Sequence, residues 1–555
     1  MPKVLSRLIV ASALLFLFAG ASSAQRSAID TYAITNARIV TVSGPVIDRG
    51  TVVVRNGLIA AAGANVTAPS DARVIDGTGL TVYPGLIDSY TNLALPEAAP
   101  SPSPAGGGGG GFFFATQPQR PAGGPNSTQP VGLQPEVMVE DVIRPGGTEI
   151  ESSRNVGITT ALTSPRSGIW MGQSALINLA GETPQQMIVR SPVAMHVGFT
   201  PLRAGGYPGS LLGVFSSLRQ MMLDAQRYRD SLQIYERAPR GTRRPETDRS
   251  LAALIPVIEG RMPVVMLANS EREIARALDL GAEFKLKLII AGGREADRVA
   301  DRLAKQNVPV LLSLNLPKRT TAALPEADPE PLRVLRERVE AQQTAGKLAK
   351  AGVRFAFQSG SLTNISDLLG NVRITIENGL QAADAVRAFT IWPAEILGAQ
   401  NQLGSIEVGK IANLTVTRGD LFDRNSRVTH VFIDGHPVDI RPAVTGAGPG
   451  RNNFSGTWTA NVNLGQGDRA ITLTLQQEGE RLSGSIAGPL GAGEISNASA
   501  SNTGEVKFTV SVNVEGQTKE ATFTGRLANN EIRGNVSIVG SAPGTFTATR
   551  SGQPN

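Results

Sequence analysis

Tyr83-Pro84-Gly85-Leu86-Ile87-Asp88-Ser89-Tyr90-Thr91-Asn92-Leu93 is the stretch that decides the fold of this 555-residue chain. Downstream of it, apolar runs alternate with amphipathic helical patterns at 271–280 and 294–306, as in repeated β/α units. The runs that read as buried strands are 157–162, 262–268, 287–291, 308–314 and 353–357. The pattern predicts an α/β fold with a (β/α)8 TIM-like barrel over residues 86–401. In such a barrel a site lies at the C-terminal ends of the strands.

The stretch resembles the first barrel strand of the amidohydrolase superfamily, whose pattern there is PGLID-x-H-x-H. The framing residues are present, but Tyr90 and Asn92 stand where the two histidines are expected. Three later segments resemble family motifs in the right order: 390–398, 403–414 and 431–435. The resemblance covers about residues 33–440, and within the superfamily it is to imidazolonepropionase-like, metal-dependent hydrolases. It implies a hydrolase acting on non-peptide carbon–nitrogen bonds, with zinc or another divalent metal.

The resemblance also places the remaining ligands of such a metal, and other residue types occupy those positions. Leu267 and Asn269 stand at a strand end that reads H-A-H in metal-bearing relatives. Gly292 stands at a histidine position, and Gly360 at the position of an aspartate. Six former metal-ligand positions therefore carry substituted residues: Tyr90, Asn92, Leu267, Asn269, Gly292 and Gly360.

Composition gives the same result independently of the motif. The chain has three histidines and no cysteine, whereas zinc needs three or four convergent nitrogen or sulfur donors. His196 lies mid-chain and is expected to be a satisfied core or rim histidine, while His430 and His436 fall far from the barrel mouth. No G-x-S-x-G or DxDxDG pattern offers a replacement. We therefore expect no metal, no cofactor and no assignable catalytic residue.

A pocket that has lost its metal can still bind a small polar ligand. The candidate lining residues are Asp88, Tyr90, Asn92, Asn269, Gln358 and Ser359. Their amide, hydroxyl and carboxyl groups suit hydrogen bonds to a neutral molecule. Simple filling of the vacated space is the competing interpretation.

The two ends of this region are expected to form one composite β-sandwich, from residues 25–85 and 402–441. Asn56-Gly57 between apolar alternating runs predicts a hairpin, because both turn positions need positive φ. After a linker at 442–453, residues 454–555 predict a C-terminal antiparallel β domain, a small barrel or a meander. A Pro- and Gly-rich insertion at 96–135, with Phe112-Phe113-Phe114, interrupts the barrel pattern.

Residues 1–24 predict a signal peptide. Lys3 and Arg7 precede an apolar run at 8–18, and small residues at 21–24 suit cleavage. Export to the periplasm is expected, with no membrane span after cleavage. Removal of the two cations lowers the net charge from +6 to +4 (6 − 2). The basic stretch 227–249 is interleaved with acidic residues, so no nucleic-acid partner is expected.

These observations leave three functional hypotheses open. The first is a pseudoenzyme with a degenerate metal site, which binds a ligand or forms a hetero-oligomer with an active relative. The second is a hydrolase acting on non-peptide carbon–nitrogen bonds through a rebuilt site. The third is an envelope interaction module that works through the insertion and the C-terminal domain.

Overall fold

The computed structural model describes residues 30–96, 129–202, 207–317, 331–362, 364–440 and, with short gaps, 454–550. The chain divides into two compact units, Met1–Pro442 (unit 1) and Ala443–Asn555 (unit 2). The predicted signal peptide and linker, and residues 97–128 of the predicted insertion, lie outside the described residues. No helix among the described residues is long and apolar enough to cross a membrane.

Both ends of unit 1 contribute to one eight-stranded sheet, ordered β18-β17-β16-β5-β1-β2-β3 with β4 on β1. Its strands are β1 (Thr31–Ile39), β2 (Ile47–Arg55), β3 (Leu58–Gly63), β4 (Arg73–Asp76), β5 (Leu80–Pro84), β16 (Leu414–Arg418), β17 (Arg427–Ile433) and β18 (His436–Val438). The predicted hairpin is confirmed: Asn56 (φ 51°) and Gly57 (φ 79°) join β2 to β3. The antiparallel pairing of β5 with β16 joins the two ends of the unit.

The rest of unit 1 is mixed α/β. A six-stranded sheet has the order β15-β14-β13-β12-β11-β8, and its first five strands are parallel. A four-stranded sheet has the order β10-β9-β7-β6. The strands are β6 (Leu86–Thr91), β7 (Ile158–Thr163), β8 (Trp170–Gln173), β9 (Ala175–Asn178), β10 (Ile188–Arg190), β11 (Met195–Val197), β12 (Val264–Ala268), β13 (Leu288–Gly292), β14 (Val310–Ser313) and β15 (Phe355–Gln358). All five predicted buried runs form strands.

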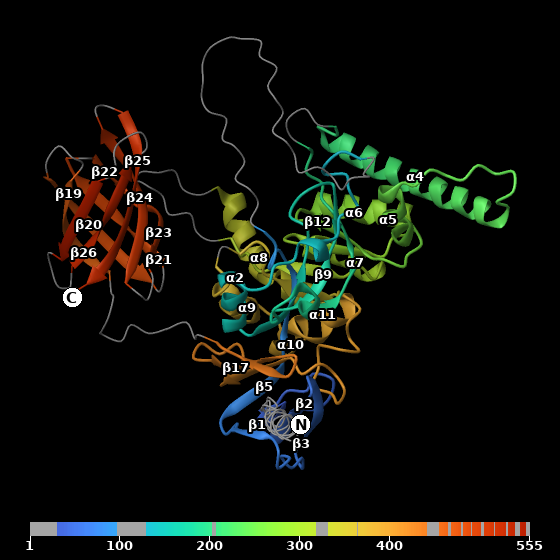
Figure 1. Cartoon of the computed structure of the whole chain (residues 1–555), viewed down its shortest axis with the longest axis horizontal. Coiled ribbons are helices and arrows are strands. Elements are labelled where there is room, and N and C mark those ends of the chain that lie inside the picture. Colours follow the sequence, from blue (N-terminus) through green and yellow to red (C-terminus); the bar gives the residue numbers. More distant parts are fainter. Residues whose placement is uncertain are drawn as a thin grey trace, which may run out of the picture. The chain divides into compact units, whose positions relative to one another are not determined.

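Helices alternate with these strands and cover them (Figure 1). They are η1 (Val139–Val142), α2 (Thr148–Asn155), α3 (Pro184–Met187), α4 (Leu211–Arg237), α5 (Arg249–Ile258), α6 (Glu271–Glu283), η2 (Ala296–Val299), α7 (Ala300–Lys305), α8 (Leu332–Lys350), α9 (Asp367–Glu377), α10 (Ala382–Phe389) and α11 (Ile391–Ile396). Helix α6 shows how its local sequence sets where the helix begins and which face is buried. Ser270 and Glu273 form a capping box at its start, and Ile274, Ala277 and Leu278 are buried on one face.

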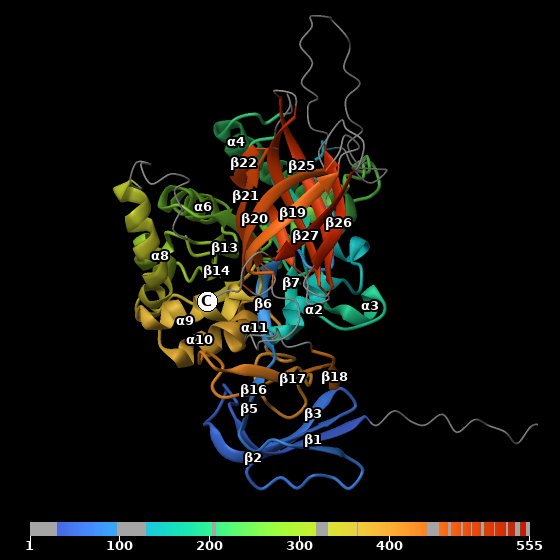
Figure 2. The same cartoon turned by 90° about the vertical axis from the view of Figure 1, so that its left-hand side faces the viewer.

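The outer strands of the two sheets lie next to each other at β6 and β15. Ser89 Oγ donates to the carbonyl of Phe357 at 2.7 Å, and the Gly360 amide donates to the carbonyl of Tyr90 at 3.1 Å. The eight-stranded sheet contacts the segment just before β7, where Thr415 Oγ1 donates to the carbonyl of Gly157 at 2.7 Å. Figure 2 shows its strands β5, β16 and β17 at the end of the unit beside α10 and α11. Residues at the C-terminal ends of β6 and β15 are therefore brought together.

Unit 2 is an antiparallel sheet, as predicted for residues 454–555. Its order is β20-β19-β27-β26-β25-β24-β23-β21-β22, and β20 also pairs with β21, so the order curls back on itself. The strands are β19 (Gly456–Asn463), β20 (Asp468–Glu478), β21 (Arg481–Gly488), β22 (Gly491–Glu494), β23 (Ser496–Ala500), β24 (Glu505–Val514), β25 (Gln517–Ala528), β26 (Glu531–Ile538) and β27 (Gly544–Arg550). Its core contains Trp458 and three phenylalanines in ring contact, Phe508, Phe523 and Phe546.

Candidate functional site

Asp88 links the two strands that carry the central site residues. It is buried in β6, and its Oδ1 accepts hydrogen bonds from the backbone amides of Ser359 (3.0 Å) and Tyr90 (3.3 Å). The Ser359 hydroxyl donates to Oδ2 of the same carboxyl group. Burial raises the pKa of Asp88 to about 6, although the bonds from Ser359 and Tyr90 oppose the rise. A carboxyl group whose pKa lies close to neutral pH therefore joins the end of β15 to β6 through hydrogen bonds.

Tyr90 and Asn92 occupy the two former ligand positions at the end of β6. Burial raises the pKa of the Tyr90 hydroxyl, and a side-chain hydrogen bond with Ser164 partly offsets the rise. The Asn92 amide donates to the carbonyl of Ser164 at 2.8 Å. Both side chains are therefore held toward the same segment after β7.

Gly360 and Gln358 complete the arrangement from β15. The Gly360 amide donates to Gln358 Oε1 at 2.9 Å as well as to the Tyr90 carbonyl. A Cβ at position 360 would lie 2.8 Å from that carbonyl oxygen, which is closer than real Cβ contacts. An aspartate at this position would therefore require the end of β6 to move. Gln358 itself is buried.

The remaining former ligand positions lie on β12 and β13. Leu267 is half-buried and packs against the apolar cluster that contains Tyr90, and Asn269 is exposed just beyond β12. Gly292 pairs with Ala268 and has a φ of 100°, a region that side-chain-bearing residues rarely adopt. A Cβ there would lie 2.5 Å from Asn269 Oδ1. The Asn269 side chain therefore occupies the space that a side chain at position 292 would need.

His196 is the functional candidate that sequence reasoning undervalued. It lies in β11, and its ring is fully buried 5.6 Å from the Tyr90 ring, measured between centroids. Neither ring nitrogen has a hydrogen-bond partner among the residues that the structure describes, which differs from the expectation of a satisfied histidine. Burial lowers the pKa of His196 to about 3, which keeps the ring neutral. The alternation of β11 was the available signal: Met195 and Val197 join the large outer core, so His196 faces the other way.

The other two histidines are placed as predicted, in the eight-stranded sheet. His430 lies in β17 and His436 in β18. Burial lowers the pKa of His430. His196 is therefore the single imidazole at the strand ends.

The comparison with known families agrees with this arrangement. Residues 286–438, from just before β13 to the end of β18, match the sequence model of the Amidohydrolase family. Residues 286–438 of this chain are therefore similar to the Amidohydrolase family. No curated protein sequence matches it.

One solved amidohydrolase structure shares the fold of this chain, and two further structures are more distantly similar. An amidohydrolase from Thermotoga maritima has a TM-score of 0.60 at 24% identity, over 74% of this chain and 100% of that chain. A prolidase complexed with N-methylphosphonate-L-proline has a TM-score of 0.44 at 18% identity, over 74% and 100%. A Xaa-Pro dipeptidase with bound methionine in its active site has a TM-score of 0.45 at 14% identity, over the same shares. At 24% identity the likeness to the Thermotoga maritima protein concerns the fold alone.

The donors at the strand ends do not fit an amidohydrolase metal. They comprise one imidazole, His196, the hydrogen-bonded carboxyl of Asp88, and the Tyr90 phenol. In the described parts of the chain, no group of three or more His, Cys, Asp or Glu side chains could hold a metal ion. Zinc sites use three or four nitrogen, sulfur or carboxylate ligands at about 2.0–2.3 Å. This donor set supplies too few.

Proposed function

We propose that this protein is an amidohydrolase-family pseudoenzyme that binds a small, neutral, polar ligand at the ends of its strands. The unpartnered nitrogens of His196 are the observation that carries the proposal. An unsatisfied buried polar group costs about 1–3 kcal/mol, and a hydrogen-bonding ligand would remove that cost. Asn92, Leu267 and Asn269 are partly or fully exposed and provide the approach from solvent.

The proposal includes closure of the two unit 1 sheets into one (β/α)8 barrel. Support comes from the bonds between β6 and β15, and from the amides of Ser174 and Val193, which bond to the carbonyls of Ala194 (3.0 Å) and Ser174 (2.9 Å) near β9 and β11. A barrel of this kind presents its site at the strand ends. We also propose that residues 25–85 and 402–441 are its composite sandwich, and that the protein is exported to the periplasm with residues 1–24 removed.

Ligand binding is tested by a melting-temperature screen of the purified mature protein with succinimide, hydantoin and N-acetylglycinamide. These neutral amides carry both donors and acceptors that can meet a neutral imidazole. We expect at least one to raise the melting temperature of the wild type, because binding to the folded state alone stabilises it. The rise should disappear in His196→Phe and remain in His430→Phe, the matched control. Equal rises in both variants would contradict the assignment.

A second measurement tests the absence of metal dependence. We expect the purified mature protein to retain less than roughly a tenth of an equivalent of zinc, manganese or nickel, because the nitrogen donors of the former ligand positions are missing. Its melting temperature should not change when zinc or a chelator is added, since a ligand that does not bind the folded state cannot stabilise it. Stoichiometric metal that survives chelator washing would refute the proposal.

Asp88 and Ser359 favour a second candidate function, a hydrolase of non-peptide carbon–nitrogen bonds with a rebuilt site. A carboxyl group with a pKa of about 6 that is hydrogen-bonded to a hydroxyl is suited to proton transfer near neutral pH. Chelator-resistant hydrolysis of a probe amide that is lost in Ser359→Ala would support this candidate over the first. Roles as an envelope interaction module, or as the partner of an active relative, remain further hypotheses.

A further inference from the structure

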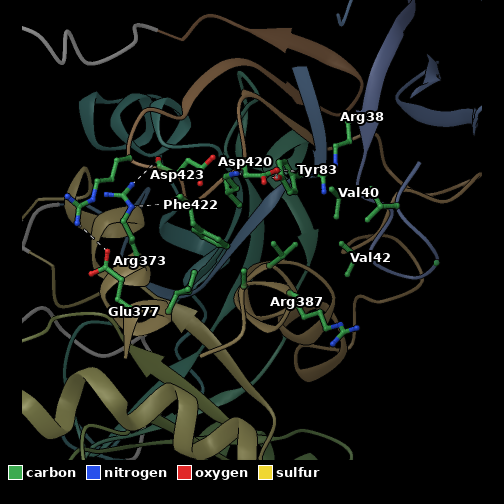
Figure 3. A pocket seen from close by; sticks show the side chains of 18 residues that line it. Arg38, Val40, Val42, Tyr83, Arg373, Glu377, Arg387, Asp420, Phe422 and Asp423 are labelled. Carbon is green, nitrogen blue, oxygen red and sulfur yellow. Dashed lines mark hydrogen bonds and ion pairs between the residues drawn. The ribbon is translucent and has the colours of Figure 1, made fainter. Parts of the chain in front are cut away.

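A cavity of about 580 Å³ lies between the eight-stranded sheet and the helices α9 and α10 (Figure 3). Its walls come from the start of the chain, from α9 and α10, and from residues 420–424 after β16. None of its lining residues is among the strand-end residues described above. Its volume falls within the roughly 300–1,000 Å³ that is usual for small-molecule sites.

Much of the wall is apolar. Val40, Val42 and Val46 line it from the sheet side, and Val386 and Phe422 from the other side. Val46 is 44% exposed, so this part of the wall meets solvent. Such a wall suits a ligand with a hydrocarbon body.

Most of the charged groups around the cavity are neutralised by one another. Asp420 Oδ1 lies 2.5 Å from Arg38 Nη1, and it accepts a hydrogen bond from the Tyr83 hydroxyl at 3.4 Å. Burial raises the pKa of Tyr83, which keeps that hydroxyl protonated. Arg424 pairs with Glu377 at 3.4 Å.

Arg373 differs from these groups. Its guanidinium donates to two backbone carbonyls, those of Phe422 at 2.7 Å and Asp423 at 3.0 Å. Among the described residues it has no carboxylate partner, and it is half-buried in the cavity wall (Figure 3). A guanidinium presents five N–H donors in a fork that matches a carboxylate. Within the described part of the chain the Arg373 guanidinium therefore forms no ion pair within 4 Å, although the Asp423 carboxyl also lines the cavity.

The backbone at Val42 is a second, independent sign of function. Its φ is 70°, in the left-handed region that β-branched residues strongly avoid. Strained residues of this kind cluster at binding sites, where the surrounding structure holds them in place. The turn around Val42 is fixed by Thr41, whose hydroxyl accepts from the Gly44 amide (3.1 Å) and donates to the Pro45 carbonyl (3.1 Å). Val42 itself lines the cavity.

We infer that this cavity binds a small monocarboxylate with an apolar body. The carboxylate would meet Arg373, and the hydrocarbon part would pack against Val42, Val386 and Phe422. The site is separate from the proposed strand-end site, so the two can be tested independently.

Octanoate and octanamide are matched probes, because they have the same chain length and differ in charge. We expect calorimetry on the full mature protein to show octanoate binding at least about tenfold more tightly, since hydrogen bonds to a charged group are stronger than those to a neutral amide. Arg373→Gln should remove this preference, and Arg373→Lys should keep part of it. Arg387→Gln is the matched control: Arg387 also lines the cavity, but it is exposed and paired with Asp384 at 3.0 Å, so the preference should persist.

A cavity-filling variant tests where octanoate binds, and it leaves the hydrogen bonds and ion pairs of the cavity wall in place. Ala383 is exposed on the first turn of α10 and lines the cavity, so Ala383→Trp should leave the fold intact and abolish octanoate binding. Equal affinity for the two probes, no binding of octanoate, or unchanged binding in Ala383→Trp would each overturn the inference.

Discussion

Lowering the pH from 7 to 4 is expected to destabilise unit 1 of the wild type by on the order of 3 kcal/mol relative to the His196→Phe variant. The pKa of His196 is about 3 in the folded state and near 6.5 in the unfolded state, so below pH 6.5 the unfolded state binds more protons. Stability is therefore lost progressively as the pH falls from 6.5 toward 3. Phenylalanine cannot take up a proton, and it also removes two buried unsatisfied nitrogens. At pH 7 the variant should already be more stable.

The measurement is urea unfolding of unit 1 at several pH values, followed by tryptophan fluorescence. The chain has three tryptophans, of which Trp458 lies in unit 2, so a Trp458→Phe background reports on Trp170 and Trp392 of unit 1. His430→Phe is the control, because His430 is only partly buried. If the stability difference between wild type and His196→Phe stays constant from pH 4 to pH 7, the pKa of His196 is the same in the folded and unfolded states, and the prediction is wrong.

Asp88→Asn should have the opposite effect on the pH profile. The folded-state pKa of Asp88 is about 6, above its ordinary value of 3.8, so between these values the folded state binds more protons. The wild type therefore loses stability as the pH rises from about 4 to above 6, by roughly 2–3 kcal/mol relative to the variant. Asparagine retains the acceptor for the Ser359 and Tyr90 amides and can donate to the Ser359 hydroxyl.

The two substitutions together make a sharper test than either alone. In the wild type the contributions of His196 and Asp88 oppose each other between pH 4 and 7 and nearly cancel. Relative to the wild type, stability should therefore rise with pH in Asp88→Asn and fall with pH in His196→Phe. Differences of the same sign in both variants would contradict the buried environments described for these residues.

Much of the fold could be predicted because its signals are local. The apolar runs that became β12, β13 and β14, and the Asn56-Gly57 turn, are each set by a few adjacent residues. The substitutions at Tyr90 and Asn92 were equally visible, since a motif fixes its positions by spacing. The count of three histidines limited the metal chemistry without any structure.

The state of the site residues could not be predicted, because it depends on partners that are distant in sequence. Asp88 and Ser359 are 271 positions apart, and only the adjacency of β6 and β15 buries the carboxyl group and shifts its pKa. His196 was expected to be satisfied, since most buried polar groups are hydrogen-bonded. Its lack of partners follows from which side chains surround β11, and no sequence pattern encodes that.

The sequence by itself determined the resemblance to the amidohydrolase family, several of the strands and helices, and the residue types at the former metal-ligand positions, because these follow from motif spacing, periodicity and composition. The tertiary structure alone decided that His196 lies unpartnered beside Tyr90, and that Arg373 lines a cavity with Val42 and Phe422. The physical reason is that burial and charge compensation are properties of a three-dimensional neighbourhood. That neighbourhood is assembled from segments hundreds of residues apart.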